Sequence, residues 1–344
     1  MDIEKIIKSN FFLNKKDIRL DNFIKSALYS KNGYYYNKKP IGKKNDFVTA
    51  PEISQTFGEI IGIYLFYNWK VKIKSKFNLI ELGPGRGTLF KDIENSVKNY
   101  PEFLSYANIS FIEINNELIK VQKNNFKKIK FYKFNWSKSI NFRSKLPSII
   151  YSNEFFDCFP VRQFIKKNLW FEKFVSVNEK NNNFYFKDKL VKNKKLIYKL
   201  NRYKEKVLEI SIERNKYFEK ICKFIKMNGG IFLTIDYGYD KNIKNFTLQA
   251  IQNHKPSHVL ENIGNQDISS HVNFKDLIEI ANSYKLNIEE FCTQRQFLIK
   301  YGILERKEIL SKSSHSKKIN TGVDRLINKK EMGNLFKFLI ISNL

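Results

Sequence analysis

A glutamate followed by three glycines at alternate positions is the first stretch of the sequence that could do chemistry. Residues 78–92 read NLIELGPGRGTLFKD, with Glu81 just before a turn through Gly83, Gly85 and Gly87. Such glycines let the backbone approach a ligand closely, and the helix expected after the turn presents free N–H groups. No Gly-Lys-Ser/Thr follows, so the turn is not a P-loop. The carboxylate suits a cation better than a pyrophosphate, which favours S-adenosylmethionine, with its sulfonium and ammonium groups, over a nicotinamide site or a structural turn.

A second carboxylate is expected one strand further along the chain. Residues 108–112 read as a strand, and Glu113 follows it 26 residues after Gly87. Pockets built from a strand, a glycine turn and a helix hold the ribose hydroxyls with an acidic residue about 20 residues past the glycines. We therefore predict that Glu113 binds the ribose, and an exposed carboxylate at the strand end is the alternative.

Two residues after the next strand are candidates for the adenine. Residues 129–134 are predicted to form this strand, and Asn135 and Trp136 follow it directly. An amide can meet the edge of the base, and an indole can meet its face. For Trp136 the alternative is a half-buried packing residue.

The loop after a fourth predicted strand, residues 147–151, carries three polar side chains. The stretch from 151 to 164 reads YSNEFFDCFPVRQF and contains Asn153, Glu154 and Asp157. Open parallel sheets place their chemistry at the carboxyl ends of their strands. We predict that Asn153 contacts the cofactor and that Glu154 and Asp157 are catalytic, with a cofactor contact or a helix cap as the alternative for Glu154.

Alternating strands and helices are predicted to position these residues, which is typical of a parallel sheet with helices on both faces. The predicted strands span 77–81, 108–112, 129–134, 147–151, 231–235, 286–293 and 335–342. The longer predicted helices span 51–69, 115–126, 212–228, 274–284 and 297–309, and residues 311–320 are expected to be mobile. We divide the chain into an N-terminal helical and lid region, 1–72, a core, 73–165 and 209–344, and an inserted segment with a hairpin, 166–208.

Composition narrows the class of protein and its partners. The chain has 344 residues and a formal net charge of +28, but its lysines are spread along the whole sequence, which favours a solvated basic surface over a nucleic-acid site. The three cysteines have no zinc-ligand spacing, so we expect a reducing compartment and no metal. No apolar run approaches 18 residues, which predicts no membrane span. The N-terminus has the pattern of neither a signal peptide nor a transit peptide.

Five segments together resemble the MidA-like family of class I S-adenosylmethionine-dependent methyltransferases. They are 33–62, 81–89 (ELGPGRGTL), 153–164 (NEFFDCFPVRQF), 235–238 with 247–250 (IDYG and TLQA), and 332–335 (MGNL). The resemblance implies a Rossmann-like seven-stranded class I methyltransferase sheet, with an N-terminal helical region and inserted segments, and S-adenosyl-L-methionine as the cofactor. It also implies a protein substrate, since the mitochondrial members of the family are complex I assembly factors that methylate an arginine of a core subunit.

Carried over by position, the resemblance implies that Glu81 and the three glycines hold the methionine end of the cofactor and that Glu113 holds its ribose. It also implies that residues 153–157 line the substrate side. This chain departs from the family at the Ile-Asn-Asn that follows Glu113 and in the Lys/Asn-rich segment after Lys166. These departures concern the adenine side and the recognition surface.

Arginine is protonated at any physiological pH, so an enzyme that methylates it must orient the guanidinium with carboxylates. We hypothesise that Glu154 clamps the guanidinium and that Asp157 assists or orders the loop. The competing functions are an RNA methyltransferase, a small-molecule methyltransferase and a non-catalytic assembly chaperone. We expect a cytoplasmic protein in a bacterium, or one of the mitochondrial matrix in a eukaryote, and leave a homodimer open.

Overall fold

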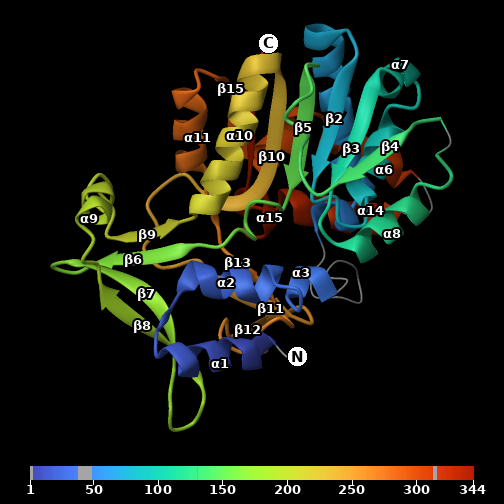
Figure 1. The fold of residues 1–344 in the computed structure, drawn as a ribbon. Helices are drawn as coiled ribbons and strands as arrows, with labels where there is room; N and C mark the ends of the chain where they lie inside the picture. The colour runs from blue at the N-terminus through green and yellow to red at the C-terminus, as the bar shows by residue number, and fades with distance from the viewer. Residues whose placement is uncertain (1–2, 38–48, 130, 313–315) are drawn as a thin grey trace.

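A large mixed sheet covered by helices forms one half of the protein, and a smaller layer of strands and N-terminal helices lies below it (Figure 1). The computed structural model describes residues 3–37, 49–129, 131–312 and 316–344. No helix among these residues is long and apolar enough to cross a membrane. Residues 38–48 of the predicted lid lie outside the described part of the chain.

The large sheet has the strand order β4-β3-β2-β5-β10-β16-β15, and β14 pairs with β10 as an eighth strand. Its strands are β2 (Phe77–Leu82), β3 (Ala107–Ile112), β4 (Phe134–Ser137), β5 (Ser148–Asn153), β10 (Gly230–Tyr239), β14 (Val272–Asn273), β15 (Asn287–Thr293) and β16 (Phe336–Asn343). β16 runs antiparallel to both of its neighbours, and the other pairs are parallel. The predicted seven-stranded sheet is therefore confirmed as the main path of this sheet.

The central strands are apolar on both faces because helices cover both faces. Every residue of β2 is buried. Leu79 packs with the helices of one face, and its neighbour Ile80 packs with those of the other. The first face holds α5 (Gln55–Asn68), α6 (Thr88–Ser96), α12 (Gln294–Lys300), α13 (Ile303–Ser311) and α14 (Ser316–Ile327), and the second holds α10 (Ile212–Asn228) and α11 (Phe274–Ser283). The remaining elements around the sheet are η1 (Trp69–Ile73), α7 (Pro101–Ser105), α8 (Asn116–Asn125) and α15 (Met332–Leu335).

The smaller layer combines the inserted segment with the N-terminus. Its arm sheet contains β1 (Ile18–Arg19), β6 (Arg162–Lys166), β7 (Trp170–Val177), β8 (Phe184–Leu190) and β9 (Val207–Ile210), and α9 (Lys194–Leu200) follows β8. The predicted hairpin is confirmed as β7 and β8, and the arm sheet extends the predicted segment 166–208 by a few residues at each end. A three-stranded sheet, β11 (Gln249–Gln252), β12 (Lys255–Ser257) and β13 (Asp267–Ser269), packs with α1 (Ile3–Asn14) and α2 (Leu20–Tyr29). α3 (Tyr34–Asn37) and α4 (Ala50–Ile53) lead from this layer to the core.

Several predicted elements are wrong in their limits. The strand predicted at 129–134 corresponds to β4, which begins only at Phe134. A short apolar run indicates that a strand is near but does not fix where the strand begins. The helix predicted at 51–69 is interrupted at Ser54, whose backbone is extended. The helix predicted at 297–309 is interrupted at Gly302, whose φ of 93° ends α12. Residues 316–320, which we expected to be mobile, belong to α14.

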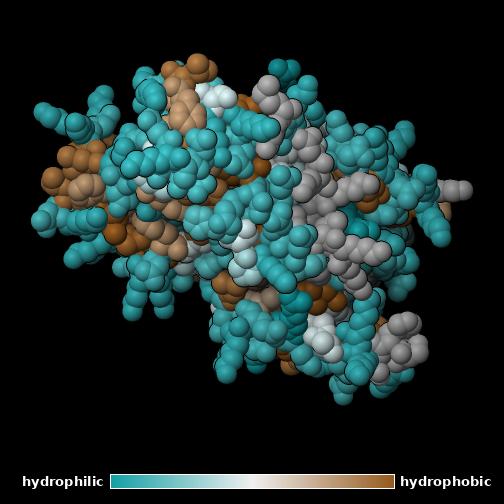
Figure 2. Space-filling model, turned by 90° about the horizontal axis from the view of Figure 1, so that it is seen from below, coloured by the Kyte–Doolittle hydropathy of each residue, from teal (hydrophilic) through white to brown (hydrophobic). Residues whose placement is uncertain are grey.

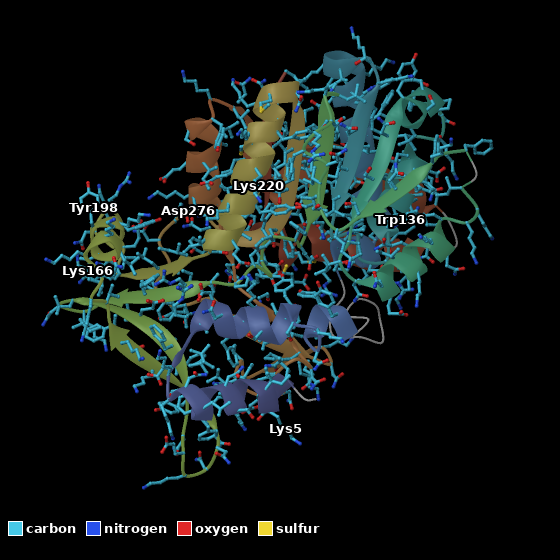
Figure 3. The ribbon with its side chains drawn as sticks, viewed as in Figure 1. Lys5, Trp136, Lys166, Tyr198, Lys220 and Asp276 are labelled. Atoms are coloured by element: carbon cyan, nitrogen blue, oxygen red, sulfur yellow. The ribbon has the colours of Figure 1, made fainter. Side chains whose placement is uncertain are left out.

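Basic side chains occur on elements of both layers. Lys5 on α1, Lys166 on β6 and Lys220 on α10 lie on three separate parts of the molecule (Figure 3). Most of the surface seen from below is hydrophilic, and the hydrophobic atoms in that view gather mainly toward the arm sheet at the left (Figure 2).

Candidate active site

A cavity of about 390 Å³ lies at the carboxyl ends of β2, β3 and β5. Its other walls come from α2, α3 and α4, so the small layer closes over the core sheet. This volume is in the range of cavities that hold small ligands. The predicted residues that line it are Glu81, Gly83, Gly85, Glu113, Asn153 and Glu154.

The glycine turn brings the backbone to the edge of this cavity. Gly83, Gly85 and Gly87 have φ values of 60°, 56° and 79°, in the left-handed region where side chains with a Cβ are strained. A Cβ at Gly83 would lie 2.9 Å from the ring of Phe155, and one at Gly87 would lie 2.5 Å from the ring of Phe126. Gly87 is the N-cap of α6 and does not itself line the cavity. Its role in this geometry is to let α6 begin here.

Glu81 and Glu113 present two buried carboxyl groups to the cavity. Burial raises the pKa of Glu81 to about 8, and the hydroxyl of Tyr151 donates to Glu81 Oε2 at 3.1 Å. Burial likewise raises the pKa of Glu113 to about 7, although the amide of Asn115 donates to Oε1 at 2.8 Å. Among the described residues, no lysine or arginine forms an ion pair with either carboxylate. Both groups are therefore ready to accept a cation or hydroxyl groups from a ligand.

Gln122 is a site residue that we missed in the sequence. It is fully buried on α8, and its amide donates to Gly85 O at 2.7 Å and to Glu113 Oε2 at 3.4 Å. The side chain thus ties the glycine turn to the second carboxylate. The sequence did hold a signal for this residue: Gln122 lies on the core-facing side of an amphipathic helix. The side-chain amide of a buried glutamine needs hydrogen-bond partners, so it is expected to contact other polar groups.

Asn135 and Trp136 lie within β4, and neither is among the described residues that line the cavity. Asn135 is exposed, and its amide lies 3.5 Å from Ile109 O. The indole of Trp136 donates to Gln122 Oε1 at 2.8 Å (Figure 3 labels Trp136 on β4). The structure therefore places Trp136 behind Gln122, and the register error in this strand explains why we assigned both residues to the adenine.

Asn153 and Glu154 stand at the end of β5. Glu154 has a φ of 52°, a conformation that strains a residue other than glycine and that is concentrated at functional sites. Its Oε1 accepts hydrogen bonds from the Ala50 amide at 3.3 Å and from the Asn153 side chain at 3.1 Å. Burial, and then repulsion by Asp157, raise the pKa of Glu154 to about 8. Among the described residues, no lysine or arginine forms an ion pair with it.

Asp157 lies deeper than Glu154 and does not line the cavity. Burial raises its pKa to about 6, and the hydroxyl of Tyr237 donates to Oδ2. The other oxygen, Oδ1, is buried without a hydrogen-bond partner in the described structure. Asp157 is thus placed to order the loop, while Glu154 faces the cavity.

Asp236 is a second residue that we did not single out from the sequence. It ends the buried part of β10, and its Oδ2 accepts from the amides of Phe155, Phe156 and Asp157 at 3.1, 2.8 and 3.3 Å. Three backbone donors on one carboxylate oxygen fix the path of the loop after Glu154. The carboxylate therefore sets where Glu154 and Phe155 point.

Replacing Asp236 with alanine is expected to lower the free energy of unfolding by about 3 kcal/mol, because three buried amides lose their acceptor. Urea denaturation measures this change. The matched control is Asp240→Ala, since Asp240 is exposed on the same strand's continuation and its replacement should change stability by less than about 0.5 kcal/mol. Equal stability of the two variants would show that Asp236 does not hold the loop.

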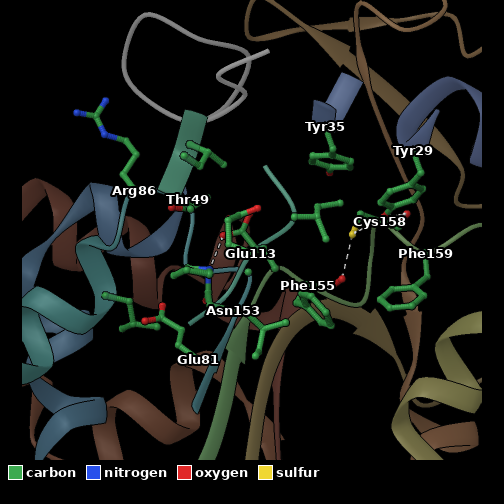
Figure 4. A pocket seen from close by; sticks show the side chains of 18 of the residues that line it. Tyr29, Tyr35, Thr49, Glu81, Arg86, Glu113, Asn153, Phe155, Cys158 and Phe159 are labelled. Atoms are coloured by element: carbon green, nitrogen blue, oxygen red, sulfur yellow. Dashed lines mark hydrogen bonds between the residues drawn. The ribbon is translucent and has the colours of Figure 1, made fainter. Parts of the chain in front are cut away.

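The cavity has an acidic end and an aromatic end (Figure 4). In this view Glu81, Glu113 and Asn153 lie toward one side, and the rings of Tyr29, Tyr35, Phe155 and Phe159 lie toward the other. The strand order, the glycine turn and the paired carboxyl groups at the tips of adjacent strands define a class I methyltransferase fold, with Glu81 and Glu113 at the acidic end of the cavity.

Comparison with known proteins gives the family. Residues 60–292 match the profile of a family described as "Putative S-adenosyl-L-methionine-dependent methyltransferase". The chain belongs to this family, so it is an S-adenosylmethionine-dependent methyltransferase and S-adenosylmethionine is its cofactor.

Curated relatives cover most of the chain. It is 30% identical over 342 residues to the mitochondrial protein arginine methyltransferase NDUFAF7 of Danio rerio, which covers 90% of this chain and 80% of the relative. It is 29% identical over 343 residues to the Homo sapiens protein of the same name, covering 90% and 76%. A crystal structure from Burkholderia thailandensis, bound to S-adenosyl-homocysteine, superposes with a TM-score of 0.88 at 21% identity and covers 99% of this chain and 92% of that one. The predicted fold and the family resemblance are confirmed.

The residues at the acidic end fit this cofactor. Two buried carboxyl groups without a cationic partner can face its positive charge and its ribose, and the glycine turn removes the side chains that would fill its place. We propose that Glu81, Gly83 and Gly85 hold the methionine end, that Glu113 holds the ribose and that Asn153 completes the contact. When bound, the cofactor supplies a methyl group activated by a sulfonium.

Affinity for S-adenosylmethionine is expected to rise as the pH rises from about 6 to 8. Near neutral pH the ligand-free protein keeps protons on Glu81, with a pKa of about 8, and on Glu113, with a pKa of about 7. A cation favours the ionised carboxylates, so binding releases protons, and each one released changes Kd by about tenfold per pH unit. Above the higher pKa the gain ends because both groups are already ionised.

Calorimetry in buffers of different ionisation enthalpy measures the Kd and counts the released protons. S-adenosylhomocysteine is the control, because it lacks the sulfonium and should show a weaker dependence on pH. A Kd for S-adenosylmethionine that is constant over this range, with no proton release, would contradict the assignment of these carboxylates.

Proposed function

We propose that the chain is a protein arginine N-methyltransferase. The observation that carries this proposal is Glu154, whose side chain lines the cavity and forms no ion pair with a lysine or arginine among the described residues. A guanidinium is a planar cation whose N–H groups pair with both oxygens of a carboxylate. The relatives named above are protein arginine methyltransferases, which supports the same acceptor.

Glu154 would orient the guanidinium of the substrate arginine and stabilise its positive charge in the complex. A guanidinium beside its carboxylate would favour ionisation of a group whose pKa is otherwise about 8. The bidentate pairing fixes the plane of the guanidinium, so that one nitrogen can be held about 3 Å from the methyl carbon. Methyl transfer would break the carbon–sulfur bond of the sulfonium and leave a neutral thioether, and the guanidinium nitrogen would give up a proton. Glu154, whose pKa is raised to about 8, would be a suitable acceptor for that proton.

Asp157 would act through the loop in this proposal. The Tyr237 hydroxyl and Asp236 hold the loop from two sides, and the carboxylate of Asp157 repels that of Glu154. This repulsion keeps Glu154 at a higher pKa until a cation arrives. We therefore assign Asp157 as a positioning residue.

The acceptor that the family resemblance implies is a subunit of respiratory complex I or its bacterial equivalent. The corresponding location is the cytoplasm of a bacterium or the mitochondrial matrix, and the curated relatives are mitochondrial by name. A homodimer is compatible with this proposal, and light scattering of the purified protein would measure it.

Transfer of a tritiated methyl group into a cell lysate tests the proposed function. The expected result is one labelled protein whose acid hydrolysate contains labelled methylarginine, and mass spectrometry then identifies the protein and the modified position. Label in RNA, in small molecules or in other amino acids would overturn the proposal. So would the absence of any transfer by a protein that binds S-adenosylmethionine normally.

A further inference from the structure

The aromatic end of the cavity is built by a part of the chain outside the methyltransferase core. Tyr29 at the end of α2 and Tyr35 on α3 both line the cavity, and their rings stack with centroids 5.5 Å apart and an interplanar angle of 28°. Phe155 and Phe159 of the loop after β5 complete this wall. This end of the cavity is therefore largely aromatic, with the rings of Tyr29, Tyr35, Phe155 and Phe159 on one side of the view (Figure 4).

Both tyrosine hydroxyls are held by fixed acceptors. The hydroxyl of Tyr35 donates to Asp267 Oδ1 at 2.8 Å, and the hydroxyl of Tyr29 donates to Cys158 O at 3.0 Å. Asp267 is buried on β13, 232 residues away from Tyr35 in the sequence. The rings are thus pre-oriented by their polar ends and by their mutual stacking, and both still line the cavity.

Three carboxyl groups also lie close together at this end, Glu154 in the lining of the cavity and two aspartates behind it. Glu154, Asp157 and Asp267 lie close enough for the two aspartates to raise the pKa of the glutamate. Lys25, one of the lysines of the lining, already pairs with Glu213 at 2.6 Å near the surface. A neutral acceptor would gain nothing from three carboxyl groups, whereas a cation would be attracted by them and by the π faces of the rings.

We propose that Tyr29, Tyr35 and Asp267 form an acceptor chamber that selects a guanidinium over an ammonium group. A planar guanidinium stacks on aromatic faces, and a compact, strongly hydrated ammonium does so less well. Asp267 acts through Tyr35 by fixing the ring, and the two rings set the specificity of the site. This inference rests on the proposed function, because it names the part of the chain that distinguishes arginine from lysine.

Binding of two small cations tests the chamber without knowledge of the protein substrate. The probes are butylguanidinium and butylammonium, titrated by NMR into protein saturated with S-adenosylhomocysteine. For the unmodified protein we expect butylguanidinium to bind at least fivefold more tightly than butylammonium. In Tyr35→Leu this preference should fall below twofold, while the Kd for S-adenosylmethionine stays within twofold of its original value.

Three further variants keep the test decisive. Tyr35→Phe retains the ring but loses its hydrogen bond to Asp267, and Asp267→Asn weakens that bond, so each should lower the preference by less than Tyr35→Leu does. Both remain informative if Tyr35→Leu does not fold. Tyr185→Leu is the matched control, because Tyr185 is exposed on β8 and its loss should change neither Kd. Equal affinity for the two cations in the unmodified protein, or an unchanged preference in Tyr35→Leu and Asp267→Asn, would refute the chamber.

The lysate experiment separates this inference from the proposed function. Labelled methylarginine together with no guanidinium preference would refute the chamber and leave the arginine methyltransferase standing. Guanidinium preference that is lost in Tyr35→Leu, together with no methylarginine, would support the chamber and refute the proposed reaction.

Discussion

Replacing Glu154 with glutamine is expected to lower kcat for methyl transfer at least about a hundredfold, which is the usual effect of removing one preorganised electrostatic group. The Kd for S-adenosylmethionine should stay within about threefold, because Glu81 and Glu113 hold the cofactor end in our proposal. Glutamine keeps the shape of the side chain but cannot pair with a guanidinium through two anionic oxygens. Single-turnover transfer and calorimetry measure the two quantities separately.

The same substitution should not weaken the fold. Burial raises the pKa of Glu154 from 4.5 to about 8, so the folded protein keeps a proton that the unfolded chain releases. The free energy of unfolding therefore falls as the pH rises from about 4.5 to 8, because the folded state binds a proton on Glu154 that the unfolded chain does not bind. Glu154→Gln removes this cost and should be at least as stable as the unmodified protein at pH 8 in urea denaturation.

A glutamate on the surface provides the control for both measurements. Glu102 is exposed on α7, and Glu102→Gln should change neither transfer nor stability. Full methyl transfer by Glu154→Gln with normal cofactor binding would disprove the clamp. A large loss of stability at pH 8 would instead mean that the carboxylate is structural.

Replacing Glu81 with glutamine is expected to raise the Kd for S-adenosylmethionine at least about thirtyfold, since truncating one partner of a buried charge pair costs about 2 kcal/mol or more. The rise of affinity with pH should shrink with it, because one of the two titrating groups is gone. Calorimetry over a pH series measures both effects in one set of titrations.

Tyr151→Phe is the companion variant for this experiment. It removes the hydroxyl that donates to Glu81 but leaves the carboxylate in place, so its effect on Kd should be clearly smaller. A Kd in Glu81→Gln within threefold of the original value would place the cofactor's positive charge elsewhere.

The residues of the acidic end could be predicted because they are close together in the sequence, and their contact with the cofactor stays a proposal. Glu81, the three glycines and the first turn of α6 lie within one short stretch. The glycines themselves indicate a tight turn, because they adopt the positive φ values that other residues disfavour. Glu113 follows from the next strand by the same logic. Asn135 and Trp136 were expected to follow their strand, but β4 includes them and they do not line the cavity described here. Their contact with the adenine stays a prediction.

The aromatic end could not be predicted, because it depends on contacts between distant segments. Nothing in the sequence around Tyr35 indicates that its hydroxyl meets Asp267, since this pairing depends on how the small layer docks on the core. Gln122 and Asp236 were missed for a related reason. Their function is to satisfy buried backbone groups, and these groups are known only once the turn and the loop are built.

The position of β16 has a consequence for how the protein is made. This strand is the last that the structure describes, yet it lies between β10 and β15, and β16 is the partner that joins β15 to the sheet. A nascent chain that has already produced every cavity residue still has an open gap in its sheet. The sheet can therefore be completed no earlier than the synthesis of residues 336–343, and a chain cut before them would expose two unpaired edges to aggregation.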